Sequence, residues 1–78
     1  LLNDGMVEAI QFKVMGGSDF IGTQIQKLPI RKGVLISAII RGGKCLIPGG
    51  QDAIQAQDDV IIVTTLHDIV TLGDIFER

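Results

Sequence analysis

The chain has 78 residues, of which 46% are hydrophobic, and its formal net charge at pH 7 is −2. The negative charge and the lack of Trp and Tyr argue against nucleic acid as the main partner, and no apolar run approaches the roughly 20 residues of a membrane-spanning helix. A domain of this size buries only about 60% of its unfolded surface, so pairing with a second copy would enlarge a thin core.

The first predicted element is a strand over residues 6–14. Apolar and polar side chains alternate along it: Ile10, Gln11, Phe12, Lys13 and Val14. A period of two residues is typical of a strand with one buried face. Residues 15–18 contain two adjacent glycines, which end the strand in a turn.

A short helix is predicted next, beginning at Ser18 or Asp19 and ending at Leu28. Either of the first two side chains could accept hydrogen bonds from the free amides of a first helical turn. Apolar residues recur at i, i+4 and i+7: Ile21, Ile25 and Leu28. Gly22 costs about 1 kcal/mol relative to Ala within a helix, so this helix would depend on packing against the sheet.

A β-hairpin over residues 34–48 is the predicted centre of the domain. Its first arm is a run of seven apolar or small residues rich in β-branched types, which favours a buried strand. Gly42 and Gly43 suit a two-residue turn with positive φ, so the second arm should return antiparallel. Arg41 and Lys44 flank this turn, where they could be solvated or could contact an anion.

Residues 60–65 are predicted to form a fourth strand, and residues 67–76 a terminal helix. Asp58 and Asp59 precede the strand, and adjacent carboxylates there are typical of a solvated turn or of side chains that accept from backbone amides. Ile54 would anchor the connection before them. The element order is therefore β-α-β-β-β-α, an α+β domain with a small antiparallel or mixed sheet and two helices.

The sequence offers no catalytic or metal-binding pattern. Nucleophilic catalysis needs a nucleophile with a base in reach. Cys45 is expected to be a buried, inert thiol that forms no internal disulfide, and His67 is expected on the surface or in a capping role. One His and one Cys do not make a structural zinc site, and Asp58 and Asp59 lack a third oxygen ligand at a recognisable spacing. The sequence therefore favours a binding or regulatory domain over an enzyme.

Several segments, in this order and spacing, carry a resemblance to a known family. They are residues 17–22, 28–36, 38–44 and 47–48, followed by Ile54, Asp58, Val60 and Val63. The sequence resembles the TrkA-C (RCK-C) domain, the C-terminal ligand-sensing module of cytoplasmic regulatory subunits of bacterial and archaeal potassium uptake systems. The family commonly has glycine where Gln57 stands and often an acidic residue where Gln51 stands. If the turn at Gln57 is left-handed, its side chain costs on the order of 1 kcal/mol.

The resemblance implies that residues 1–78 are a TrkA-C regulatory domain and a fragment of a longer protein. It implies a homodimer attached to an N-terminal Rossmann-like domain that binds NAD(H) or ATP, with no cofactor in the chain itself. The pair would dock on a membrane potassium transporter or channel, in the cytoplasm at the inner face of the membrane.

In some relatives cyclic di-AMP binds at the dimer interface. Carried over by position, the ligand-binding residues would be Ile39, Ile40, Arg41, Ile47 and Pro48. Two symmetry-related guanidinium groups could pair with two phosphates while aliphatic side chains pack on the purines. The same residues could instead be core and turn. Two further alternatives remain: a purely structural dimerisation module, and a soluble domain of a cation/proton antiporter or an amino-acid exchanger.

Overall fold

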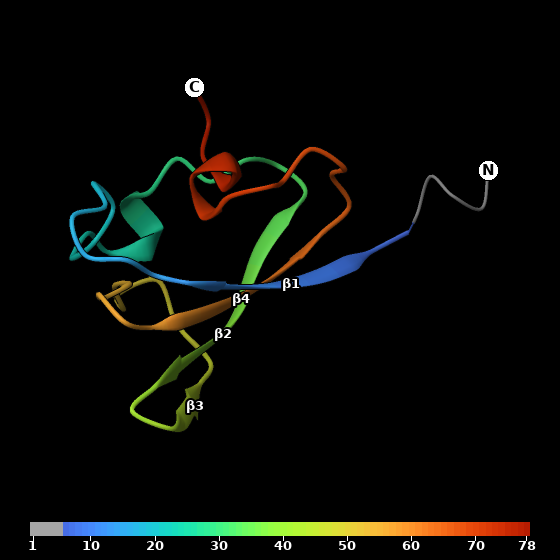
Figure 1. The fold of residues 1–78 in the computed structure, drawn as a ribbon. Coiled ribbons are helices and arrows are strands. Elements are labelled where there is room, and N and C mark those ends of the chain that lie inside the picture. Colours follow the sequence, from blue (N-terminus) through green and yellow to red (C-terminus); the bar gives the residue numbers. More distant parts are fainter. Residues whose placement is uncertain (1–5) are drawn as a thin grey trace.

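The computed structural model describes residues 6–78. These residues form one four-stranded sheet in the order β1-β4-β2-β3, in which every neighbouring pair is antiparallel (Figure 1). The strands are β1 Glu8–Lys13, β2 Val34–Arg41, β3 Lys44–Leu46 and β4 Asp59–Thr64. The last strand in sequence, β4, therefore lies inside the sheet between β1 and β2, as its continuous apolar composition favours.

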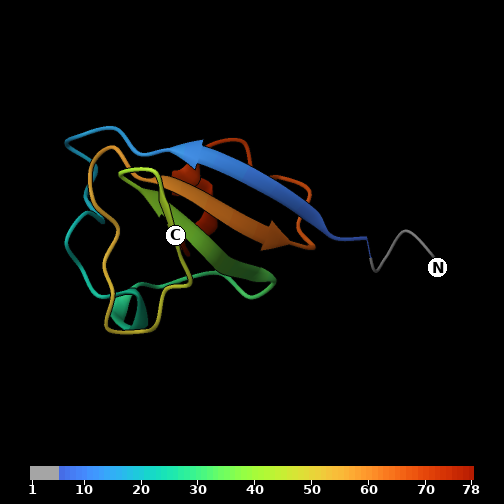
Figure 2. The ribbon, with the colours of Figure 1, turned by 90° about the horizontal axis from the view of Figure 1, so that it is seen from below.

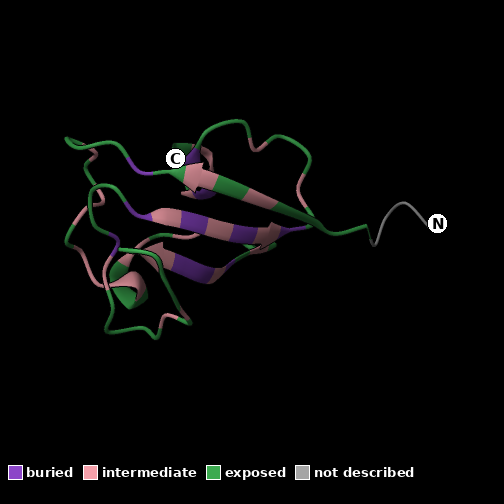
Figure 3. Ribbon diagram, turned by 60° about the horizontal axis from the view of Figure 1, so that its bottom comes forward, coloured by how far each residue is buried: buried purple, intermediate pink, exposed green. Residues whose placement is uncertain are grey.

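One face of the sheet carries the core. Along β4, Val60, Ile62 and Thr64 are buried and alternate with half-buried residues, so the strand directs every second side chain into the core (Figure 3). The connections before β2 and after β4 cover this face, with the short 3-10 helices η2 Ile25–Lys27 and η3 Leu72–Ile75 on the same side of the sheet (Figures 1 and 2). Ile54 and Ile75 are fully buried there.

The prediction of a helix from Ser18 or Asp19 to Leu28 is wrong in extent, because only the 3-10 turn η2, Ile25–Lys27, forms there. Gly22 has φ +86°, a left-handed conformation that cannot continue a right-handed helix. Its N–H donates to the carbonyl oxygen of Ile54 at 3.0 Å instead of to a helical partner. Ile21 and Ile25, the apolar residues that suggested a helical stripe, still pack against the core, Ile21 from a turn and Ile25 from the start of η2.

The predicted terminal helix is also shorter than expected and is reduced to η3. The carboxylate of Asp74 accepts hydrogen bonds from the N–H groups of Val70 and Thr71, each at 2.8 Å, and so fixes the start of η3. Phe76 ends it in extended backbone and forms an isolated antiparallel bridge with Ile30. The order β-α-β-β-β-α therefore holds for the strands, while 3-10 turns replace both helices.

Two turns have the backbone conformation that the sequence analysis considered for them. Gly42 and Gly43 have φ +58° and +79°, the two positive values that a tight hairpin between β2 and β3 needs. Gln57 has φ +73°, so the turn before β4 is left-handed although its residue is not glycine. Within residues 6–78 no helix has the length and hydrophobicity to cross a bilayer.

Candidate functional site

The face of the sheet opposite the core, onto which Figure 2 looks, is mostly apolar and also carries Gln11 and the ion pair of Lys13 with Asp59. Residues directly opposite one another in antiparallel strands share a face, so the register joins Leu35 with Val63 and Ile40 with Cys45. We call this surface the outer face; its apolar residues are Ala9, Leu35, Ala38, Ile40, Cys45, Ile61 and Val63, of which Ala38 is buried between its neighbours. Leu35 is 62% exposed, and Ile47, immediately after β3, is 80% exposed. Such a surface is typical of one that pairs with a partner.

A β-bulge in β2 decides which side chains lie on the outer face. The pairing with β4 shifts between Ile36 and Ala38, and Ser37 is the extra residue. The Ser37 hydroxyl donates to the carbonyl oxygen of Ile61 at 3.1 Å. Because of this extra residue, Ile36 and Ile39 both reach the core although they are three positions apart.

Cys45 is exposed, which corrects the expectation of a buried thiol. It lies opposite Ile40 on the three-residue strand β3, at the edge of the sheet. No described segment covers the outer side of this strand in the views of Figures 1 and 2. A cysteine in an apolar sequence run is therefore not buried here, because the run belongs to an edge strand with an open face.

Arg41, at the end of β2, forms a bidentate ion pair with Asp58. Its Nε and Nη2 atoms donate to the two carboxylate oxygens at 2.8 Å each, and Nη2 also donates to the carbonyl oxygen of Ala53 at 3.0 Å. The Asp58 carboxylate accepts a further bond from the N–H of Gln55 at 2.9 Å. The Asp58 side chain is 1% exposed and that of Arg41 is 35% exposed.

This pair shifts the pKa values of both groups. The hydrogen bond from Arg41 lowers the pKa of Asp58 against the opposing effect of its burial, and the bond from Gln55 adds to the lowering. The hydrogen bond to Asp58 likewise raises the pKa of Arg41. Both groups are therefore charged at neutral pH, and the guanidinium is held in one orientation.

The five residues expected to bind a ligand fall into separate environments. Ile39 is fully buried in the core, and Arg41 is fixed by Asp58. Ile40 is half-buried on the outer face, Ile47 is exposed, and Pro48 is half-buried. Two residues of the candidate site were not predicted from the sequence. Leu35 shares the outer face with Ile40 because of the bulge in β2, which the sequence does not reveal. Asp58 orients Arg41 although the two residues are 17 positions apart in the sequence.

A shallow depression of about 270 Å³ lies at the end of the outer face formed by β1, β2 and β4. Val7, Leu35 and Val63 are among its lining residues. The part of the chain that the structure describes contains no cluster of three side chains able to hold a metal ion. The outer face thus offers aliphatic side chains, while Arg41, one residue after Ile40 in β2, presents an oriented guanidinium from the opposite side of the strand.

The strand arrangement and sequence both have counterparts among known proteins. A solved structure described as "Structure of RCK domain with cda" superposes with a TM-score of 0.62 at 17% identity, covering 69% of this chain and 76% of that one. At this identity the likeness concerns the fold. It supports a small antiparallel sheet of the RCK type.

Curated relatives match along most of the chain. A Trk system potassium uptake protein TrkA homolog of Archaeoglobus fulgidus is 39% identical over 72 residues, which is 92% of this chain and 16% of the relative. The Trk system potassium uptake protein TrkA of Azorhizobium caulinodans is 29% identical over 75 residues, or 96% of this chain and 16% of the relative. The chain thus spans about 16% of the length of these relatives.

A comparison with models of protein families agrees with the match to the Trk relatives. The model of the TrkA-C domain family matches residues 9–77, from the second residue of β1 to the residue before the last. The relatives' names describe potassium uptake proteins rather than enzymes. The resemblance seen in the sequence is therefore confirmed, and the chain belongs to the TrkA-C domain family.

Proposed function

We propose that the chain is a regulatory domain of a potassium uptake system that pairs with a second copy through its outer face and binds a small nucleotide beside the β2–β3 hairpin. Family membership and the Trk relatives support the potassium system. The observations that carry the rest are the exposed aliphatic side chains of Leu35 and Ile47 and the oriented guanidinium of Arg41 at the end of β2.

Pairing follows from the small core. Leu35 and Ile47 leave 62% and 80% of their surfaces in solvent in the single chain. Burying aliphatic surface gains about 25 cal/mol per Å², and a two-fold arrangement would bury the same residues twice. The charges on this face, Lys13 and Asp59, form an ion pair of 3.6 Å with each other, and the Ala38–Ile61 pair beside them carries no charge.

Arg41 supplies the proposed contact to an anionic ligand. Asp58 occupies Nε and Nη2, whereas Nη1 has no hydrogen-bond partner among the described residues. The side chain remains 35% exposed, so a phosphate could accept from Nη1 without breaking the ion pair. Ile40 and Ile47 would pack on a base. Cyclic di-AMP is the ligand we propose, with two such sites related by the dimer axis.

Ligand occupancy would act by favouring one arrangement of the paired domains. A ligand shifts such an equilibrium only by its difference in affinity for the two arrangements, and a site shared between two copies provides that difference. In the longer protein, we propose that a separate Rossmann-like domain binds NAD(H) or ATP and that the assembly acts in the cytoplasm on a membrane potassium transporter. The Trk relatives favour this setting over an antiporter or exchanger.

Calorimetric titration with cyclic di-AMP tests the ligand site. Arg41→Lys keeps the charge but loses the planar fork, and we expect about tenfold weaker binding. Ile47→Ala removes exposed surface without touching the ion pair and should also weaken binding. Val70→Ala is the matched control, since Val70 is equally exposed and lies outside the outer face. Absence of binding by the unmodified chain, or equal affinities in all variants, would leave pairing as the only role.

A further inference from the structure

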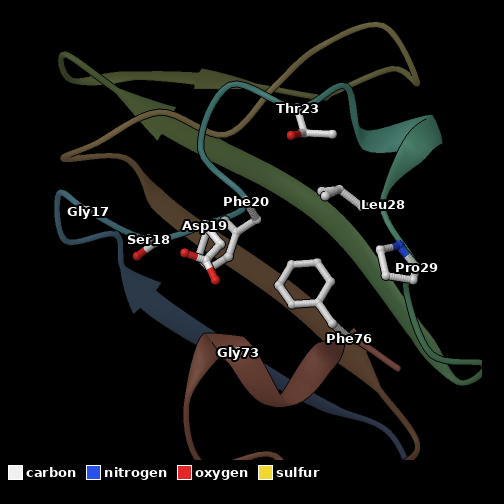
Figure 4. A pocket seen from close by; sticks show the side chains of 9 residues that line it. All are labelled: Gly17, Ser18, Asp19, Phe20, Thr23, Leu28, Pro29, Gly73 and Phe76. Carbon is white, nitrogen blue, oxygen red and sulfur yellow. The ribbon is translucent and has the colours of Figure 1, made fainter. Parts of the chain in front are cut away.

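A second candidate site lies on the opposite side of the sheet, where the chain forms a cavity of about 610 Å³. Three chain segments line it: residues 17–23, residues 28–29, and the part of the chain from η3 to Phe76. Figure 4 shows Ser18 and Asp19 at one end, Leu28 and Pro29 at the other, and the rings of Phe20 and Phe76 between them. The volume is in the range of small-molecule sites.

Hydrogen bonds between backbone groups hold the walls of this cavity in place. Glu77 N–H donates to the carbonyl oxygen of Pro29 at 2.7 Å, which ties the chain end to the second wall. Gly22 N–H donates to Ile54, so the first wall is fixed to the buried connection before β4. The rings of Phe20 and Phe76 lie 5.1 Å apart between centroids and are tilted by 36°. The cavity is therefore preformed rather than created by a ligand.

The charge in the cavity has one sign. Asp19 is the only ionisable side chain among the nine lining residues, and it forms no ion pair with another residue of the described range 6–78. The Thr23 hydroxyl also lines the cavity and makes no side-chain hydrogen bond within that range. An anionic ligand would meet a carboxylate and find no cation. A cation with an apolar body would complement the carboxylate at one end of the cavity and the apolar residues at the other.

We propose that this cavity binds an organic ammonium ion, with its nitrogen near Asp19 and its apolar body against Phe20 and Phe76. The ammonium would donate hydrogen bonds to the carboxylate and lie near the faces of aromatic rings, which attract cations. The apolar body would exclude water from the end formed by Leu28 and Pro29. The sheet separates this site from the outer face, so its ligand would be independent of pairing and of the nucleotide.

The test uses three probes that share a phenyl ring on a short chain and differ in charge: 2-phenylethylamine, 2-phenylethanol and phenylacetate. Titrations of the ¹⁵N-labelled 78-residue chain, followed by amide chemical shifts, report both affinity and place. We expect the amine to bind about fivefold more tightly than the alcohol, because Asp19 is exposed and its attraction is partly screened, and phenylacetate to bind least. The shifts should be confined to the lining segments, residues 17–29 and 73–76.

Asp19→Asn and Glu8→Gln are the matched variants, since each removes one exposed negative charge and only Asp19 lines the cavity. Asp19→Asn should abolish the preference for the amine over the alcohol while binding of the alcohol persists, which shows that the cavity is still formed. Glu8→Gln should leave the preference unchanged. Equal affinities of amine and alcohol in the unmodified chain, equal effects of both variants, or shifts outside the cavity would overturn the proposal.

Discussion

The guanidinium of Arg41 and the carboxylate of Asp58 form two parallel hydrogen bonds of 2.8 Å each, which join the end of β2 to the turn before β4. The carboxylate is almost completely buried, and the arginine extends from it to the surface beside the hairpin. One contact thus has two consequences. It holds the connection before β4 in place, and it fixes the direction in which Arg41 can donate to a ligand.

Removal of the Asp58 charge should destabilise the domain. In Asp58→Ala the guanidinium loses two charge-assisted bonds and Gln55 loses an acceptor, so we expect a loss of about 2–3 kcal/mol, less than for a fully buried pair because Arg41 is partly exposed. Urea unfolding measures this change. Asp68→Ala is the control, because Asp68 also forms a bidentate pair, with Arg31, but is 67% exposed, so little change is expected. Similar losses in both variants would contradict the role of burial.

The same pair predicts how stability depends on pH. The pKa of Asp58 is lower in the folded chain than its ordinary value of 3.8, so below that value the unfolded state binds more protons. The stability due to Asp58 is present above pH 3.8 and is lost as the pH falls through the folded-state pKa. Unfolding free energies measured from pH 6 down to about pH 2 should therefore decline less steeply in Asp58→Asn than in the unmodified chain. Parallel curves would contradict this assignment.

The left-handed turn at Gln57 predicts a stabilising substitution. Gln57 has φ +73°, and its backbone carbonyl, not its side chain, accepts a bond from Lys13 Nζ at 3.2 Å. Gln57→Gly should relieve the strain and raise stability by about 0.5–1 kcal/mol, after allowance for the greater freedom of glycine in the unfolded chain. Gln51→Gly, at an exposed position without positive φ, should bring no gain. A loss of stability in Gln57→Gly would show that its side chain contributes more than the turn.

The strands and the hairpin turn were predictable from the sequence, whereas the helices were not. Alternation along β1, the β-branched run of β2 and the glycine pair at positions 42 and 43 were sufficient to predict the strands and the hairpin, because each depends on residues adjacent in sequence. The helices were overpredicted. Ile21 and Ile25 have helical spacing, but Gly22 adopts a left-handed conformation and bonds to Ile54, a contact that only the folded chain contains.

The candidate site was predictable only in part. Ile40 and Ile47 are accessible as a ligand site requires, whereas Ile39 is buried, because the bulge at Ser37 changes which residues of β2 face outward. An unbroken apolar run gives no sign of such a bulge. The pairing of Arg41 with Asp58 depends on how β2 and β4 lie in the sheet. The Phe20–Phe76 cavity likewise joins residues from opposite ends of the chain.

The exposed Cys45 provides a probe of the outer face. If copies pair through this face, the thiol opposite Ile40 becomes covered, and its alkylation by N-ethylmaleimide should slow as protein concentration rises. Mass spectrometry of quenched samples measures the rate, and the urea-unfolded chain, which has the same single cysteine, gives the unprotected reference. Rates that do not depend on concentration, in a range where the chain is dimeric, would place Cys45 outside the interface.

Analytical ultracentrifugation over a concentration series tests pairing through the outer face most directly. The unmodified chain should change from monomer to dimer as concentration rises. Leu35→Lys, which places a charge in the outer face, should remain monomeric, and Val70→Lys, at a still more exposed position elsewhere, should behave like the unmodified chain. A monomer at every concentration, or a Leu35→Lys variant that dimerises as readily as the Val70→Lys control, would contradict the account.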